Sequence, residues 1–222
     1  MKENGKKKIA LITGASSGLG FAISNLLISD SFHVICISKN FQELEDLKKS
    51  LLEHSNPSFD LIMTDLKDQK KVKELSELIF KRWGYLNVLI HCAAQSSGMA
   101  PVNIIFESDF SDVFLNNVLS TKYIIGHMDG LLKASGNGKA IFIDDTISKK
   151  FLSTYSASKA AIRDIVLCYK RENSRLGPTV SLFSPKPMPT KLRRKFFPGE
   201  PKEKLFSCLS QAKALRKLIQ EE

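Results

Sequence analysis

The chain has 222 residues, of which 43% are hydrophobic, and carries a formal net charge of +10. This length fits a single domain spanning residues 1–222 with a sizeable core. The apolar runs are shorter than the roughly 18 residues needed to span a bilayer, and Ile9–Ile12 is too short for the apolar region of a signal peptide. We therefore expect a cytoplasmic protein without a membrane partner.

Cysteine, histidine and basic residues are scattered in ways that exclude two further classes of site. The four cysteines form no C-x-x-C pair and the four histidines show no ligand spacing, so we expect no metal site. Basic clusters occur at Lys6–Lys8 and Lys191–Lys195. Nucleic-acid binding is one interpretation of these clusters, but no aromatic residues interleave them as a stacking surface requires. We favour a solvated basic surface and expect no nucleic-acid partner.

Short β-rich runs alternate with amphipathic helical stretches along the chain. The expected strands are Ile9–Thr13, His33–Ser38, Phe59–Thr64, Val88–Cys92, Ala140–Asp144 and Thr179–Phe183. The expected helices are Leu19–Ser29, Phe41–His54, Gln69–Trp83, Phe110–Lys133, Thr154–Leu176 and Lys202–Leu218. This alternation predicts an α/β fold, a three-layer doubly wound parallel sheet. Because prolines are dense in Pro185–Pro201, we expect neither helix nor central strand there.

A glycine-rich turn joins the first strand to the first helix and reads Thr13-Gly14-Ala15-Ser16-Ser17-Gly18-Leu19-Gly20. This is the context that a dinucleotide-binding fingerprint requires. Gly14 allows a sharp turn, Gly18 lets the backbone approach a pyrophosphate, and Gly20 permits close helix packing. The helix N-terminus near Leu19 would supply anion-binding amides, with Ser16 and Ser17 beside them. The alternative is a Gly/Ser-rich turn that binds no ligand.

The end of the second strand bears on which dinucleotide binds. An acidic residue there would bond the ribose hydroxyls and repel a 2′-phosphate. The chain instead has Ser38, Lys39 and Asn40, without a carboxylate. Since Lys39 can pair with a 2′-phosphate, the sequence favours NADP(H) over NAD(H). The alternative is a surface lysine that opens the next helix.

A tyrosine and a lysine stand four residues apart at Tyr155 and Lys159. In a helix this spacing puts both side chains on one face, about 5–6 Å apart at Cβ. A free phenol has a pKa of about 10, and a nearby ammonium would lower it. The pair can therefore move a proton while a nicotinamide moves a hydride.

Taken together, these motifs resemble the short-chain dehydrogenase/reductase family. The resemblance covers about Lys8 to Thr190 and implies a Rossmann-type sheet in the order 3-2-1-4-5-6. It also implies a small carbonyl or alcohol substrate, NAD(P)(H), and a homodimer or homotetramer assembled through the helix that bears Tyr155. The positions that match the family's cofactor and active-site residues are Gly14, Gly18, Gly20, Asp65, Leu66, Ala93, Asn117, Tyr155, Lys159 and Pro185.

The resemblance assigns a role to each of the matched catalytic positions. Tyr155 would protonate the carbonyl oxygen, Lys159 would bind the nicotinamide ribose and lower the pKa of Tyr155, and Asn117 would hold a water. Asp65 and Leu66 would contact the adenine.

Four features depart from the family pattern. Asp145 falls where members carry a catalytic serine, and an ionised carboxylate only accepts hydrogen bonds. Thr146 or Ser148 would supply the hydroxyl if the loop ran differently, and a protonated Asp145 would need a large upward pKa shift. Ala94 and Lys186 replace glycines, although Ala94 remains a cofactor-contact candidate, and we expect no seventh strand.

These departures leave two classes of function open. The leading hypothesis is an NADP(H)-dependent short-chain oxidoreductase acting on a small carbonyl or alcohol. The alternative is a catalytically impaired regulatory or binding protein that keeps the nucleotide fold.

Overall fold

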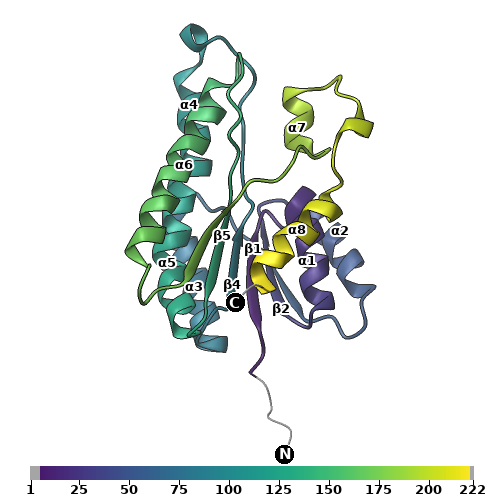
Figure 1. Ribbon diagram of the computed structural model, residues 1–222, viewed down its shortest axis with the longest axis vertical. Coiled ribbons are helices and arrows are strands. Elements are labelled where there is room, and N and C mark those ends of the chain that lie inside the picture. Colours follow the sequence, from purple (N-terminus) through teal and green to yellow (C-terminus); the bar gives the residue numbers. More distant parts are fainter. Residues whose placement is uncertain (1–5, 221–222) are drawn as a thin grey trace, which may run out of the picture.

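The computed structural model describes residues 6–220 and is built around one parallel sheet (Figure 1). Within that range the sheet has six strands in the order β3-β2-β1-β4-β5-β6, as predicted. The strands are β1 (Ile9–Thr13), β2 (His33–Ser38), β3 (Phe59–Met63), β4 (Val88–His91), β5 (Lys139–Ile143) and β6 (Thr179–Phe183). β6 lies at one edge of this sheet and β3 at the other.

Helices cover both faces of the sheet. The longer helices are α1 (Gly18–Ser29), α2 (Phe41–Leu52), α3 (Gln69–Trp83), α4 (Glu107–Phe114), α5 (Ser120–Ala134), α6 (Ser153–Glu172) and α8 (Cys208–Gln220). Figure 1 shows α1, α2 and α8 on one side of the sheet and α3, α5 and α6 on the other. No helix in the described range combines the length and hydropathy needed to cross a membrane.

The alternation of side chains along β1 divides the core into two halves. Ile9 and Leu11 pack into the cluster beneath α3, α5 and α6. Ala10 and Ile12 pack into the cluster beneath α1, α2 and α8. Because successive strand residues point to opposite faces, one fully buried apolar strand serves both layers, as expected for a sheet covered on both sides.

Three segments differ from the predicted pattern of helices. The stretch predicted as one helix over Phe110–Lys133 is instead α4, a π-helical segment (Leu115–Leu119) and α5. The last helix begins at Cys208, after a 3₁₀ turn at Lys202–Lys204. The segment Pro185–Pro201, predicted to lack helix, contains α7 (Lys191–Phe196).

The short helix α7 forms because the prolines of this segment stop at its borders. Its residues lie between Pro189 and Pro198, so no missing amide interrupts the turn. The Thr190 side chain caps it by accepting a hydrogen bond from the Arg193 amide at 3.1 Å. In Figure 1, α7 lies beyond the carboxyl ends of the strands. A prediction from proline density alone misses a helix that fits between two prolines.

Gly20 allows α1 to start directly against the turn that precedes it. A Cβ at position 20 would lie 2.2 Å from the Gly14 carbonyl oxygen, which is backbone and cannot move aside. Gly14 itself has φ 63°, in the left-handed region that favours glycine. The turn between β1 and α1 thus depends on the absence of a side chain at both positions.

We predict that Gly20→Ala destabilises the protein by about 1–3 kcal/mol or more, because the added methyl group overpacks a rigid site. Urea unfolding measures this change. The control is Gly126→Ala, since Gly126 lies within α5 and an added Cβ meets nothing within 4 Å. It should raise stability by roughly 0.5–1 kcal/mol through helix propensity. Equal stability of Gly20→Ala and wild type would contradict the steric argument.

Candidate active site

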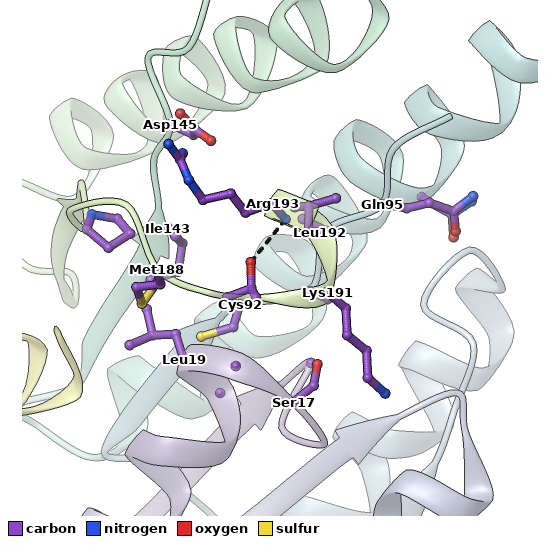
Figure 2. Close-up of a pocket in the computed structure, with 18 of the residues that line it drawn as sticks. Ser17, Leu19, Cys92, Gln95, Ile143, Asp145, Met188, Lys191, Leu192 and Arg193 are labelled. Carbon is purple, nitrogen blue, oxygen red and sulfur yellow. Dashed lines mark hydrogen bonds between the residues drawn. The ribbon is translucent and has the colours of Figure 1, made fainter. Parts of the chain in front are cut away.

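A cleft of about 440 Å³ opens at the carboxyl ends of the strands. Figure 2 shows Ser17 and Leu19 of the glycine turn, Ile143 and Asp145 at the end of β5, and Lys191 of α7 around this hollow. The predicted site residues that line it are Gly14, Ser17, Gly18, Leu19, Gly20, Ser38, Lys39, Asn40, Asp65, Leu66, Ala93, Ala94, Asp145, Tyr155, Lys159 and Pro185. Two motifs about 140 residues apart in sequence therefore meet in one cavity, which has the size of a small-ligand site.

The glycine turn presents backbone amides to the cleft. Gly18 has φ 55° and is the first residue of α1. The preceding Ser17 is extended and, within residues 6–220, its side chain makes no capping hydrogen bond. The first amides of α1 are thus available to an anion at a helix N-terminus. This part of the cleft fits the pyrophosphate of a dinucleotide.

Four predicted residues lie together where the turn approaches the end of β2. The Ser16 and Ser38 hydroxyl oxygens are 2.8 Å apart. The Lys39 ammonium donates to the Gln95 side-chain oxygen at 2.8 Å, which links the end of β2 to the loop after β4. Asn40 caps α2 by accepting from the Glu43 amide at 3.1 Å.

Glu43 was missed by the sequence analysis, which found no carboxylate in this region. Its side chain reaches back from the first turn of α2, accepts a hydrogen bond from Ser16 at 2.8 Å and pairs with Lys191. Burial would raise the pKa of Glu43, but the bonds from Lys191 and Ser16 outweigh it, so the pKa is lowered. The Asn40-x-x-Glu43 pattern, typical of a helix N-terminus, was the available signal.

Tyr155 and Asp145 are hydrogen-bonded to each other in the catalytic half of the cleft. The Tyr155 hydroxyl donates to Asp145 Oδ2 at 3.0 Å, and the Tyr155 side chain is buried. Burial and the Asp145 charge raise the pKa of Tyr155. This direction is opposite to the lowering expected from Lys159 alone. Asp145 lies two residues beyond the end of β5, whereas Thr146 and Ser148 are exposed.

Lys159 lies one helical turn beyond Tyr155 and is also buried. Its ammonium donates to the Ile143 backbone carbonyl at 2.7 Å. Burial lowers the pKa of Lys159, while the charges of Asp145 and Asp144 oppose this shift. Asp144, a second residue that the sequence analysis did not select, forms a salt bridge with Arg163 at 2.8 Å.

Asn117 lies in the π-helical segment and is fully buried behind the cleft. Its Oδ1 accepts a hydrogen bond from the Gln95 backbone N–H at 2.7 Å, and its Nδ2 donates to the Gln95 backbone carbonyl at 2.8 Å. It also donates to the Ser158 hydroxyl at 3.0 Å. Through these bonds Asn117 joins the loop after β4 to the helix that carries Tyr155 and Lys159. Such π-helical insertions are frequent at functional sites.

His91 ends β4 but points into the core. Its Nδ1 lies 2.8 Å from the Thr13 hydroxyl and its Nε2 lies 3.1 Å from the Thr121 hydroxyl. Burial, with a smaller effect of the Lys159 charge, lowers the pKa of His91 to about 3. The ring is therefore a neutral connector between β1, β4 and α5.

Comparison with known proteins identifies the family. The model of the short chain dehydrogenase family matches residues 8–201, and the chain belongs to this family. An uncharacterized oxidoreductase of Staphylococcus aureus strain MW2 is 27% identical over 201 residues, covering 88% of this chain and 84% of the relative. A diacetyl reductase, (S)-acetoin forming, of Staphylococcus epidermidis strain ATCC 12228 is 28% identical over 189 residues, covering 80% and 70%.

Solved structures show the same fold. A putative short chain dehydrogenase from Pseudomonas syringae superimposes with a TM-score of 0.90 at 20% identity, covering 96% of this chain and 90% of that chain. An alcohol dehydrogenase from the archaeon Thermococcus sibiricus, complexed with 5-hydroxy-NADP, gives a TM-score of 0.84 at 24% identity, covering 97% and 92%.

We predict that His91 makes stability fall between neutral pH and pH 5. An unfolded histidine takes a proton below about pH 6.5, whereas folded His91 stays neutral down to about pH 3. The unfolded state therefore binds more protons in this window, and the loss at pH 5 is about 2 kcal/mol. Urea unfolding from pH 5 to 8 should show a shallower slope for His91→Asn than for wild type. Parallel pH profiles would contradict this assignment.

Proposed function

We propose that this protein is an NADP(H)-dependent short-chain oxidoreductase that interconverts a small carbonyl compound and its alcohol. The observation that carries the proposal is the shared cleft, which the glycine turn enters from one end and Tyr155 and Lys159 from the other. When bound, the nicotinamide would supply or accept the hydride at the reacting carbon. The diacetyl reductase among the relatives supports a carbonyl substrate.

Tyr155 is the proposed proton donor in the reducing direction. Its raised pKa keeps the hydroxyl protonated at neutral pH, and a hydroxyl can turn from Asp145 toward a substrate oxygen. Lys159 would hold the nicotinamide ribose, since an ammonium has three donors and Ile143 takes one. Asn117 is proposed as a positioning residue. Its bonds to Gln95 and Ser158 would hold the loop after β4 against α6.

The cofactor would lie along the remaining predicted residues. The Gly14–Gly20 turn, with Ser16 and Ser17, would hold the pyrophosphate, and Asp65 and Leu66 the adenine. Ala93, Ala94 and Pro185 would line the nicotinamide end. Lys39 supports NADP(H) over NAD(H), because it lines the cleft and its ammonium, of which Gln95 takes one donor, has further donors for a 2′-phosphate. Glu43 opposes a 2′-phosphate, but Lys191 neutralises its charge.

We further propose a cytoplasmic protein that acts on a small molecule as a homodimer or homotetramer, without a membrane or nucleic-acid partner. The alternative function, a catalytically impaired nucleotide-binding protein, is favoured by one observation. The Tyr155 hydroxyl donates to Asp145, which as an ionised carboxylate only accepts, whereas a serine there can donate to the phenol oxygen or to a substrate.

We predict that Tyr155→Phe abolishes reduction of small ketones with NADPH, because it removes the proton donor. NADPH affinity should stay within about threefold, since the phenyl ring keeps the packing against Phe196. Initial rates with a ketone panel and calorimetry measure the two effects. Unchanged turnover in Tyr155→Phe would place the proton donor elsewhere. A wild type that binds NADPH but reduces no ketone would favour the impaired protein.

We predict that Lys39→Met weakens NADPH binding by about tenfold, the value of one charge-assisted hydrogen bond. NADH binding should change by less than about threefold. Calorimetric titration with both cofactors tests this, with Lys49→Met on α2 as a control because Lys49 does not line the cleft. Equal losses for NADPH and NADH would show that Lys39 does not contact a 2′-phosphate.

A further inference from the structure

Asp145 differs in its partners from two other carboxylates of the cleft, whereas Asp65, which also lines the cleft, likewise has no salt bridge among residues 6–220. Asp144 is paired with Arg163 and Glu43 with Lys191. Among residues 6–220, the hydrogen-bond donors to Asp145 are both neutral, namely the Tyr155 hydroxyl and the Ile147 amide, each at 3.0 Å. Within the described part of the chain, Asp145 thus brings a negative charge to this end of the cleft without a direct salt bridge, and the charges of Lys159 and Arg163 lie close enough to interact with it.

This carboxylate retains room for a further donor. An ionised carboxylate has about four acceptor positions and cannot donate, and the two described bonds occupy one position on each oxygen. A substrate group that meets Asp145 must therefore donate a hydrogen bond. A cationic donor gains most, because charge-assisted hydrogen bonds are about twice as strong as neutral ones.

The surroundings of Asp145 increase that preference. Apolar side chains that line the cleft pack in one cluster with Tyr155, the partner of Asp145: Ile147, Leu192 and Phe196. Such walls strengthen the attraction between opposite charges and make an unpaired charge costly. Arg193 also lines the cleft, but its guanidinium is bonded twice to Glu200. The Arg193 guanidinium is thereby paired with Glu200 and not with Asp145.

We propose that the substrate carries a protonated nitrogen on the carbon next to the reacting carbon. The substrate pair is then a vicinal amino ketone and the corresponding 1,2-amino alcohol. The Tyr155 oxygen and Asp145 Oδ2 lie 3.0 Å apart, a spacing that an oxygen and a nitrogen on adjacent carbons match. The substrate oxygen faces Tyr155 and the ammonium donates to Asp145. This inference rests on the proposed function and names its substrate class.

A matched pair of ligands tests the role of Asp145 by binding alone. The probes are 2-amino-1-phenylethanol and 1-phenyl-1,2-ethanediol. Both have a hydroxyl on the carbon next to the ring, and the adjacent carbon carries an ammonium in the first and a hydroxyl in the second. Calorimetry on the full chain saturated with NADPH prevents turnover, because both the alcohol and the cofactor are then reduced. We expect wild type to bind the amino alcohol at least about tenfold more tightly than the diol.

Variants separate the charge of Asp145 from other effects. Asp145→Asn should bring the two affinities within about threefold, whereas Glu45→Gln, on α2 outside the cleft, should keep the wild-type ratio. NADPH binding reports whether each variant is folded, and Asp145→Ser replaces Asp145→Asn if the latter is not. Equal binding of both ligands by wild type, no binding of either, or an unchanged ratio in Asp145→Asn would overturn the proposal.

Turnover with NADP⁺ distinguishes this proposal from the function on which it rests. Selective, Asp145-dependent binding of the amino alcohol without oxidation would support the substrate class and refute the oxidoreductase function. Oxidation of both alcohols at equal kcat/KM would support the oxidoreductase and refute the substrate class.

Discussion

Three consecutive acceptors at the end of β5 meet three donors on one face of α6. The Ile143 carbonyl accepts from Lys159, the Asp144 carboxylate from Arg163 and the Asp145 carboxylate from Tyr155. The donors are spaced four residues apart, which aligns them along a helix. These bonds fix α6 against the sheet and also set the chemistry of the site. A change in one acceptor therefore alters both the position and the proton affinity of the side chain that donates to it.

The parallel register of the sheet brings this cluster to the glycine turn. Thr13 pairs with His91, and His91 pairs with Phe142. The residues that follow these three strands consequently emerge side by side at one edge. The close approach of Gly14 to the Ala93 backbone is a direct result, since a Cβ on Gly14 would lie 2.8 Å from the Ala93 amide nitrogen. Ligand sites in open parallel sheets form at such a place.

Much of this arrangement was predictable from the sequence because its signals are local. The short apolar strands, the glycine turn and the Tyr155/Lys159 spacing each depend on residues close together in the chain, and the strand order followed from the family resemblance. Glu43 and α7 were missed for a different reason. The partners of Glu43, Ser16 and Lys191, come from distant segments, and α7 is short enough to fit between two prolines.

The burial of Lys159 argues for a ligand-facing role over a relic of a lost activity. An ammonium that is 4% exposed is costly to desolvate, as its lowered pKa indicates. A purely structural site would be equally well filled by an apolar side chain, which avoids that cost. A cofactor hydroxyl in the cleft that Lys159 lines would use the donors that Ile143 leaves free.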